Sequence, residues 1–276
     1  MIKKFLLTIS LTAMLFGQSS YDILNLPTDA RGAAMGVNLS PLVRPSQVLA
    51  DDPKQITLSG WNWVADIQGA YLGADLNRSH VSVLAVNFGE FEARNDIPTE
   101  DPISTFGYSL FSVGGAYAIE MNQFTLGLGA ELIYERTLNA SSTGMALSLA
   151  ASYPVNSDLE ISSGVRRLGN GGELDSAQTE LPSELWAAVD FTLNDLTILT
   201  ELNTGSYPLA VGVSYRIADI IEVLGGMQIE LAEPSMRIHP SLGLSVSREN
   251  FTVAYTNYQM SHRLGSRHFL SLYWRY

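Results

Sequence analysis

Apolar and polar residues alternate along most of this chain with a period of two. Between residues 124 and 135, every even position is apolar and the odd positions are mainly small or charged. The same alternation returns in residues 142–154, 207–217, 237–248 and 267–276. Successive side chains of a strand point to opposite faces, so each run predicts a strand with one apolar and one polar face. Helical spacing fits none of these runs.

The alternating runs predict about fourteen strands, an even number, as a bacterial single-chain barrel requires. The expected fold class is therefore all-β, a transmembrane antiparallel β-barrel. The predicted strands are 55–64, 66–76, 80–92, 104–119, 124–137, 142–154, 158–168, 182–193, 196–204, 207–217, 220–230, 237–248, 251–260 and 267–276.

The last predicted strand is the expected barrel-closing strand. One of its faces is apolar and ends in aromatic residues: Leu270, Leu272, Trp274 and Tyr276. The opposite face carries Arg267, Ser271 and Arg275. An apolar face toward lipid, a polar face toward the lumen and aromatic residues at the membrane boundary are typical of outer-membrane barrels.

The lengths of the connections alternate as well. Short turns such as 194–195 and 249–250 are interleaved with longer connections such as 93–103 and 167–181. Short periplasmic turns at one rim and longer extracellular loops at the other are expected of a membrane barrel.

A soluble β-sandwich would also show short alternating strands. The polar faces favour the barrel, because they are rich in Gly, Ser and Ala and carry charges of both signs, as a lumen partly filled by protein would. These charges are Glu131, Glu160, Arg166, Asp190, Glu201, Arg216, Glu222 and Arg275.

The start of the chain predicts export. Lys3 and Lys4 precede an apolar stretch over residues 5–16, and Gly17-Gln18-Ser19 supplies small residues at a cleavage site. A membrane-spanning helix would need about 20 apolar residues. We therefore expect a signal peptide over residues 1–19, an N-terminal periplasmic or lumenal segment over 20–54, and an outer-membrane barrel over 55–276.

Composition excludes several classes of function. The 276 residues carry a net charge of −12 and contain no cysteine. An acidic chain does not suit nucleic acid, which needs a basic surface, and the absence of cysteine excludes disulfides and cysteine-ligated metal sites. The expected partner is outer-membrane lipid, with no nucleic acid.

The segment before the barrel breaks the alternation, because it is rich in small residues. A short helix or coil that enters the lumen would suit it, with Arg31 meeting lumen carboxylates, since a buried arginine needs such a partner. A flexible periplasmic leader is the alternative.

Short motifs in this segment resemble the opening of the PorV/PorQ family of outer-membrane barrels. They are Leu24-Asn25-Leu26-Pro27, Ala30-Arg31 and Ala33-Ala34-Met35-Gly36, and the first looks most like the PorQ branch. The runs at 61–72 and 264–272 are similar to later blocks of the family. One departure stands at Asp51-Asp52-Pro53-Lys54, where the family usually carries Asn-Pro-Ala.

The resemblance implies a fold similar to that of the FadL fatty-acid transporter. It also implies a part in the type IX secretion system of Bacteroidetes-like bacteria, in protein secretion or cell-surface attachment of cargo through loops and rim, with other secretion or surface-attachment proteins as partners.

The alternative function is a FadL-like transporter of hydrophobic small molecules. Such a transporter needs an apolar pocket near the lumen mouth. Trp186, Phe269 and Tyr273 are the candidate lining residues, although they could equally pack against the N-terminal segment.

An outer-membrane enzyme is the third possibility, with His262 and His268 at the outer rim as its candidates. Serines are too frequent for a sequence pattern to indicate a Ser-His-Asp triad, and no metal-ligand spacing occurs. We expect no catalytic residue, no metal site and no cofactor.

Overall fold

The computed structural model describes residues 22–48, 54–63, 66–93, 104–137, 140–174, 177–232, 235–260 and 265–276. The predicted signal peptide, residues 1–19, lies outside the described residues, as do residues 20–21 and 49–53 of the N-terminal segment.

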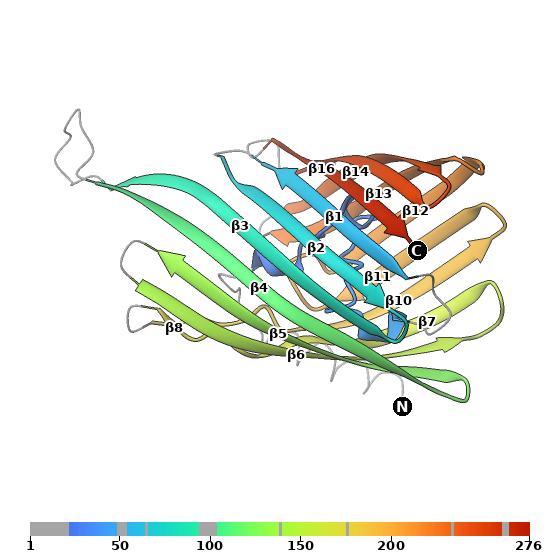
Figure 1. Cartoon of the computed structure of the whole chain (residues 1–276), viewed down its shortest axis with the longest axis horizontal. Helices are drawn as coiled ribbons and strands as arrows, with labels where there is room; N and C mark the ends of the chain where they lie inside the picture. The colour runs from blue at the N-terminus through green and yellow to red at the C-terminus, as the bar shows by residue number, and fades with distance from the viewer. Residues whose placement is uncertain are drawn as a thin grey trace.

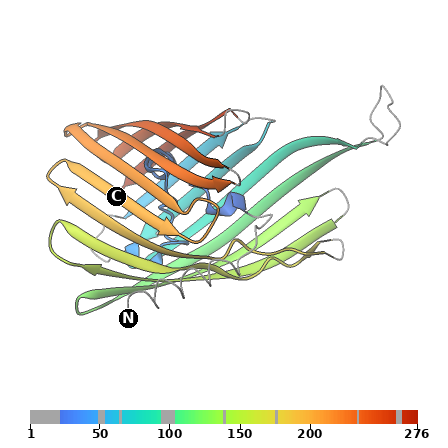
Figure 2. The ribbon, with the colours of Figure 1, turned by 180° about the vertical axis from the view of Figure 1, so that it is seen from behind.

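Fourteen antiparallel strands form one closed barrel, which confirms the predicted fold class (Figures 1 and 2). The first and last strands pair, with Leu58 opposite Leu272, and this pairing closes the ring. In chain order the barrel strands are β1 (Gln55–Asn62), β2 (Gln68–Leu76), β3 (Ser79–Ala93), β4 (Ser104–Met121), β5 (Phe124–Thr137), β6 (Ala140–Pro154), β7 (Leu159–Asn170), β10 (Glu184–Leu193), β11 (Leu196–Asn203), β12 (Leu209–Ala218), β13 (Ile221–Ala232), β14 (Ser235–Arg248), β15 (Phe251–Gln259) and β16 (Ser266–Arg275).

Each predicted strand exists, but several boundaries were wrong. The first strand ends at Asn62 and the second begins at Gln68. Asp66 between them adopts φ 60°, a left-handed conformation that a regular strand does not accommodate. The region predicted as one loop, 167–181, holds the end of β7 and a two-stranded sheet of β8 (Glu173–Leu174) and β9 (Ala177–Gln178).

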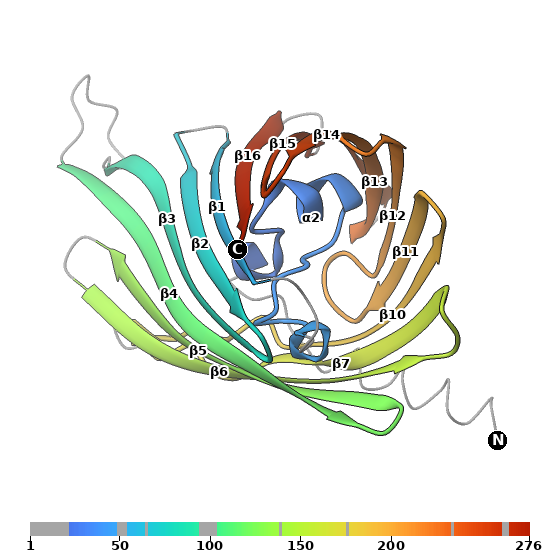
Figure 3. The same cartoon turned by 45° about the vertical axis from the view of Figure 1, so that its right-hand side comes forward.

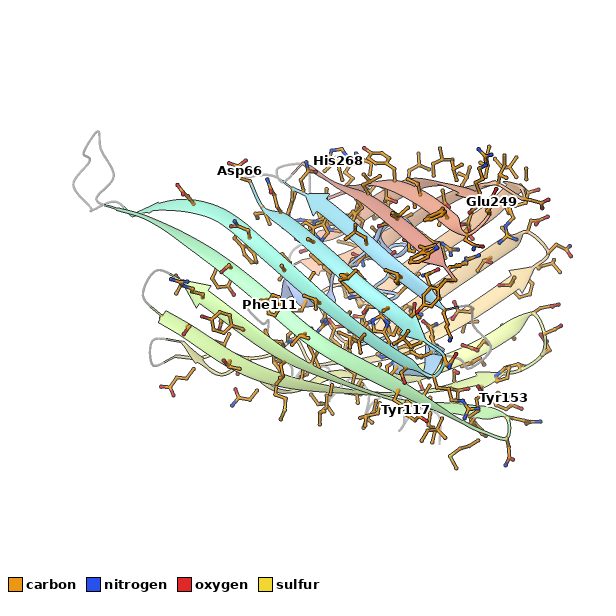
Figure 4. All side chains as sticks on the ribbon, viewed as in Figure 1. Asp66, Phe111, Tyr117, Tyr153, Glu249 and His268 are labelled. Carbon is orange, nitrogen blue, oxygen red and sulfur yellow. The ribbon has the colours of Figure 1, made fainter. Side chains whose placement is uncertain are left out.

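Four of the short turns share one conformation. Asn77, Asn122, Asn194 and Glu249 each open a two-residue turn with φ between 52° and 56°. Positive φ is what the tight turns of antiparallel hairpins need, and Asn accepts it readily. These turns lie at one rim, here called the short-turn rim, with Glu249 and Tyr153 at that end in Figure 4. Asp66 and His268 lie at the opposite, long-loop rim.

The outer face is apolar, and the chain is an outer-membrane barrel. Leu126, Leu128 and Leu132 are about half exposed, whereas their neighbour Glu131 is buried. The predicted face of β16 also points outward, with Leu270, Leu272, Trp274 and Tyr276 all exposed. Trp274 stacks on Phe251 of β15 with 6.2 Å between the ring centroids. Apolar side chains on the outside match the lipid that surrounds such a barrel.

The described part of the N-terminal segment lies inside the ring of strands (Figure 3). It consists of a 3-10 helix η1 (Asp22–Asn25), a helix α2 (Ala30–Met35) and a second 3-10 helix η2 (Pro45–Gln47), joined by irregular chain. Among the described residues, no helix is long and apolar enough to cross a membrane.

Candidate functional site: the lumen and the N-terminal segment

Helix α2 is short, and two flanking residues, Asp29 and Gly36, cap its ends. The Asp29 carboxylate accepts a hydrogen bond of 2.9 Å from the backbone N–H of Gly32, which caps the N-terminus. Gly36 follows the last turn with φ 71°, and its N–H donates to the Ala33 carbonyl. A glycine suits this left-handed position because it has no Cβ.

Inward-facing glycines allow α2 to approach the barrel wall closely. A Cβ on Gly226 of β13 would lie 2.6 Å from the Ala34 carbonyl oxygen, and one on Gly212 of β12 would lie 2.6 Å from that of Met35. A Cβ on Gly243 of β14 would lie 2.7 Å from the Ala34 side chain. Three neighbouring strands therefore leave space for this helix.

Wall side chains bond to the backbone of α2 and its flanks. Ser271 Oγ accepts from the Ala30 N–H at 2.8 Å, and Thr256 Oγ1 donates to the Ala30 carbonyl at 2.6 Å. Ser241 Oγ donates to the Ala34 carbonyl at 2.8 Å, and Gln228 Nε2 donates to the Gly36 carbonyl at 2.6 Å. The small polar residues of the inward faces thus satisfy groups at the ends of a buried helix.

A second contact holds η2 against the opposite wall. Gly127 and Gly129 of β5 leave no room for a Cβ, because the backbones of Pro45 and Leu42 occupy that space. Leu42 and Val48 pack with Ala116 and Ala118 of β4.

Four charged residues of the lumen form a buried cluster, here called the Glu201 cluster: Arg44, Arg166, Glu184 and Glu201. Arg44 pairs with Glu201, and Arg166 pairs with Glu201 at 2.9 Å and with Glu184 at 2.7 Å. The Arg44 guanidinium lies 5.0 Å from the ring centre of Trp186. Arg44 belongs to the N-terminal segment and the other members to β7, β10 and β11, so the cluster ties that segment to the wall.

A bulge places two consecutive arginines inside the barrel. The pairing of β6 with β7 shifts register between Leu147 and Leu149, and Arg167 adopts φ 55°. Both Arg166 and Arg167 are buried as a result, although alternation would send one of them outward. Arg167 Nε pairs with Glu131 at 3.0 Å, and its Nη1 donates to Asn25 Oδ1 at 2.5 Å.

Arg31, which the sequence predicts to meet a lumen carboxylate, pairs with Glu222. Arg31 Nη2 lies 3.0 Å from Glu222 Oε1, and the Arg31 side chain is 39% exposed. The other residues of the family motif are packing residues: Leu24, Leu26, Pro27, Ala30, Met35 and Gly36 are all buried.

Apolar side chains line the lumen toward the long-loop rim. They form one cluster that includes Trp61, Leu84, Val86, Leu110, Ile133, Met260 and Phe269. The cluster extends to Tyr273 farther along β16 and to Leu24, Ala30 and Ala33 of the N-terminal segment. Arg267 enters this cluster with its guanidinium 4.7 Å from the ring centre of Trp61 and 4.4 Å from that of Trp63. Its Nε and Nη2 are buried and have no hydrogen-bond partner among the described residues.

The three candidate pocket residues lie in two places. Phe269 and Tyr273 belong to one apolar cluster, although Tyr273 lies nearer the short-turn end of β16, and Trp186 packs in a separate cluster with Ala34 and Met35. The Tyr273 hydroxyl donates to Asp29 at 2.9 Å. Tyr273 and Trp186 therefore contact the N-terminal segment, and a ligand-binding role for the three residues stays a prediction.

The histidines considered for catalysis are separated in space. His80 lies in the lumen between Asp75 (2.6 Å) and Tyr71 (3.2 Å), and His239 pairs with Glu230 at 2.9 Å. His268 points outward and meets the Tyr255 hydroxyl at 2.8 Å, and His262 lies outside the described residues. Within the described ranges, no three His, Asp or Glu side chains gather as metal ligands would.

The fold is similar to that of several outer-membrane proteins of known structure. The solved structures similar to this chain include the Pseudomonas putida toluene transporter TodX, with a TM-score of 0.66, 10% identity, and coverage of 90% of this chain and 97% of that one. The Ralstonia pickettii toluene transporter TbuX is also similar (TM-score 0.61, 10% identity, 91% and 98% coverage). So is a Pseudomonas aeruginosa FadL homologue (TM-score 0.60, 10% identity, 91% and 99% coverage).

At this level of identity the likeness concerns the fold. No protein-family model matches the chain, and no curated protein sequence matches it. The resemblance to the PorV/PorQ family therefore rests on the short motifs alone and stays a prediction.

Arg44→Met is expected to loosen the N-terminal segment, because it removes the side chain through which that segment joins the Glu201 cluster. The chain contains no cysteine, so Ser46→Cys, nearly isosteric and fully buried in η2, provides a single reporter thiol. Its rate of labelling by a water-soluble maleimide should rise in the Arg44→Met background. Arg31→Met, which removes an ion pair whose arginine is 39% exposed, is the control and should change the rate less. Equal rates in both backgrounds would contradict the role of Arg44.

Proposed function

We propose that this protein is a channel that carries hydrophobic small molecules across the outer membrane. The proposal draws on the FadL-like fold and on one observation, the apolar cluster that lines the lumen near the long-loop rim. A porin for hydrophilic solutes has a polar interior. A binding site for a hydrophobic ligand is mainly apolar with a few polar groups.

The apolar cluster has the composition of such a site. Val86 of β3 lies opposite Leu110 of β4 in the sheet, and both side chains are buried on the lumen side. Trp61 and Phe269 continue the lining across β1 and β16, with 6.2 Å between their ring centroids. Arg267 supplies two buried guanidinium nitrogens, Nε and Nη2, without a hydrogen-bond partner among the described residues.

The N-terminal segment packs on this lining, because its residues Leu24, Ala30 and Ala33 belong to the same cluster. It contacts β12 to β16 through α2 and β4 to β6 through η2. A compound that passes along the lumen therefore requires the segment to shift, or leaves the barrel before reaching it.

Protein secretion or surface attachment through the loops and rim is the second candidate. The observation that favours it is the extensive contact between the N-terminal segment and the barrel wall. A barrel that acts through its rim can have a filled lumen, because nothing passes through it. The residues of the family motifs do not discriminate between the two functions. Their side chains are buried, so packing alone explains these residue types. Copurification of secretion or surface-attachment proteins from native membranes would support this candidate.

Uptake of radiolabelled toluene tests the proposed channel. Cells without a hydrocarbon channel of their own should take up toluene faster when they produce this protein, with glucose as the polar comparison. Leu110→Gln should reduce uptake because it places an amide in the apolar lining, whereas Leu110→Met, of nearly the same size as the glutamine variant, should retain it.

Correct folding of each variant is checked by the heat-dependent gel mobility of the barrel. Uptake no faster than in cells without the protein, with the barrel folded in the outer membrane, would contradict the channel. Equal uptake by the two Leu110 variants would contradict the role of the apolar lining.

A further inference from the structure

The outer wall of the barrel carries a groove of about 790 Å³ over β1, β2, β15 and β16. Its middle is a row of residues that lie opposite one another on these strands, Ala70, Gly60, Leu270 and Tyr255. Ala70 and Gly60 are neighbours in this row, and both face outward. Two small residues side by side on a face that otherwise carries large apolar side chains leave a hollow there.

The groove is a depression in the surface and not an opening in the wall. Strand β1 pairs with β2 and with β16 at each position from Gln55 to Asn62, so the backbone beneath the groove is continuous. Leu58 and Leu270 border the groove and are more than half exposed on the face that bears the apolar belt. Lipid acyl chains therefore surround the groove.

A polar row borders the groove on the side of the long-loop rim. The strand register places Gln68, Asn62, His268 and Asn257 opposite one another, and Figure 4 shows His268 at this end of the barrel. The ring of His268 stacks on that of Tyr255 at 6.2 Å, and the Tyr255 hydroxyl meets His268 Nδ1 at 2.8 Å. When this hydroxyl donates to Nδ1, the Nε2–H of His268 is free to donate.

We propose that this groove binds one acyl chain of a phosphate-bearing lipid of the outer leaflet. The chain lies over Gly60 and Ala70 between Leu58 and Leu270, and the lipid phosphate accepts hydrogen bonds from His268 Nε2–H and the Asn62 amide. Phosphate oxygens are strong acceptors, and the polar row places its donors where the apolar belt ends. The proposal depends on the membrane position of the barrel and not on transport through the lumen.

Photo-crosslinking tests this site. The full chain is reconstituted in phosphatidylethanolamine bilayers that contain a trace of the same lipid with a diazirine in its acyl chain, and crosslinked peptides are quantified by mass spectrometry. Crosslinks should be enriched on residues 55–62 and 266–275 relative to the lipid-facing residues of 221–232. Equal yields around the barrel would overturn the proposal.

Gly60→Leu fills the groove and should abolish the enrichment. The matched control is Gly225→Leu on β13. An added Cβ has room at both positions, with its nearest contact at 4.0 Å for Gly60 and 3.8 Å for Gly225. Gly225→Leu should leave the enrichment unchanged, and an enrichment that persists in Gly60→Leu would contradict binding in the groove.

His268→Phe tests the headgroup contact, because it keeps an aromatic ring against Tyr255 and removes both ring nitrogens. It should reduce crosslinking by the phospholipid probe but not by a diacylglycerol with the same diazirine chain. Equal loss with both probes, or loss with neither, would overturn the assignment of the phosphate to His268.

Discussion

Replacing Glu201 by glutamine is expected to lower the free energy of unfolding of the barrel by about 3–5 kcal/mol, the cost of breaking a buried ion pair. The side chains of Arg44, Arg166 and Glu201 are 0%, 4% and 3% exposed. Without the Glu201 carboxylate, Arg44 loses its anionic partner while it stays buried, and Arg166 keeps only Glu184. Because these side chains are almost fully buried, water cannot solvate the arginine charge that is left without a carboxylate.

Glu222→Gln is the matched control. It removes a carboxylate from an arginine pair of the same lumen, but the Arg31 side chain is 39% exposed, so the expected loss is about 0–1 kcal/mol. Guanidinium titration in detergent micelles, followed by tryptophan fluorescence, measures both variants. Equal losses of unfolding free energy in the two variants would show that the burial of the Glu201 cluster does not determine its contribution to stability.

Deletion of residues 22–48 is expected to turn a barrel that conducts poorly into an ion-conducting pore. These residues fill the lumen with α2 and η2, and the ring of strands closes without them. The deletion also removes Arg31 and Arg44, which leaves Glu222 and Glu201 facing the lumen with less positive charge beside them. The pore should therefore prefer cations over anions.

Planar-bilayer recordings of the full chain and of the deletion variant measure this difference. The heat-dependent gel mobility of both proteins shows whether the barrel is folded. A folded deletion variant with the conductance of the full chain would show that residues 22–48 do not obstruct the lumen. Anion preference would contradict the expected charge of the pore.

The alternation of the sequence determined the barrel. Every strand of the closed ring was predicted, and the outward face of β16, Leu270 to Tyr276, was read correctly. Successive residues of a strand with lipid on one side and lumen on the other alternate between these two environments. The pattern can therefore be recognised within each strand alone.

Deviations from this period escaped the prediction. Arg167 stood where the predicted strand 158–168 and the predicted connection 167–181 overlap, but a bulge in β7 turns both Arg166 and Arg167 inward. A bulge inserts a residue at a point that alternation does not mark. The β8–β9 sheet was missed as well, because strands of two residues are too short to show a period.

Which distant residues meet in the lumen was decided by the tertiary structure alone. The sequence indicated that Arg31 needs a carboxylate, but not that its partner is Glu222 or that Arg44 joins Glu201. The sequence pattern places Gly212 and Gly243 on polar strand faces, and only the folded barrel shows that α2 lies against them and against Gly226. Alternation specifies the face on which a side chain lies, whereas the contacts across the lumen depend on the strand register and on the path of the N-terminal segment.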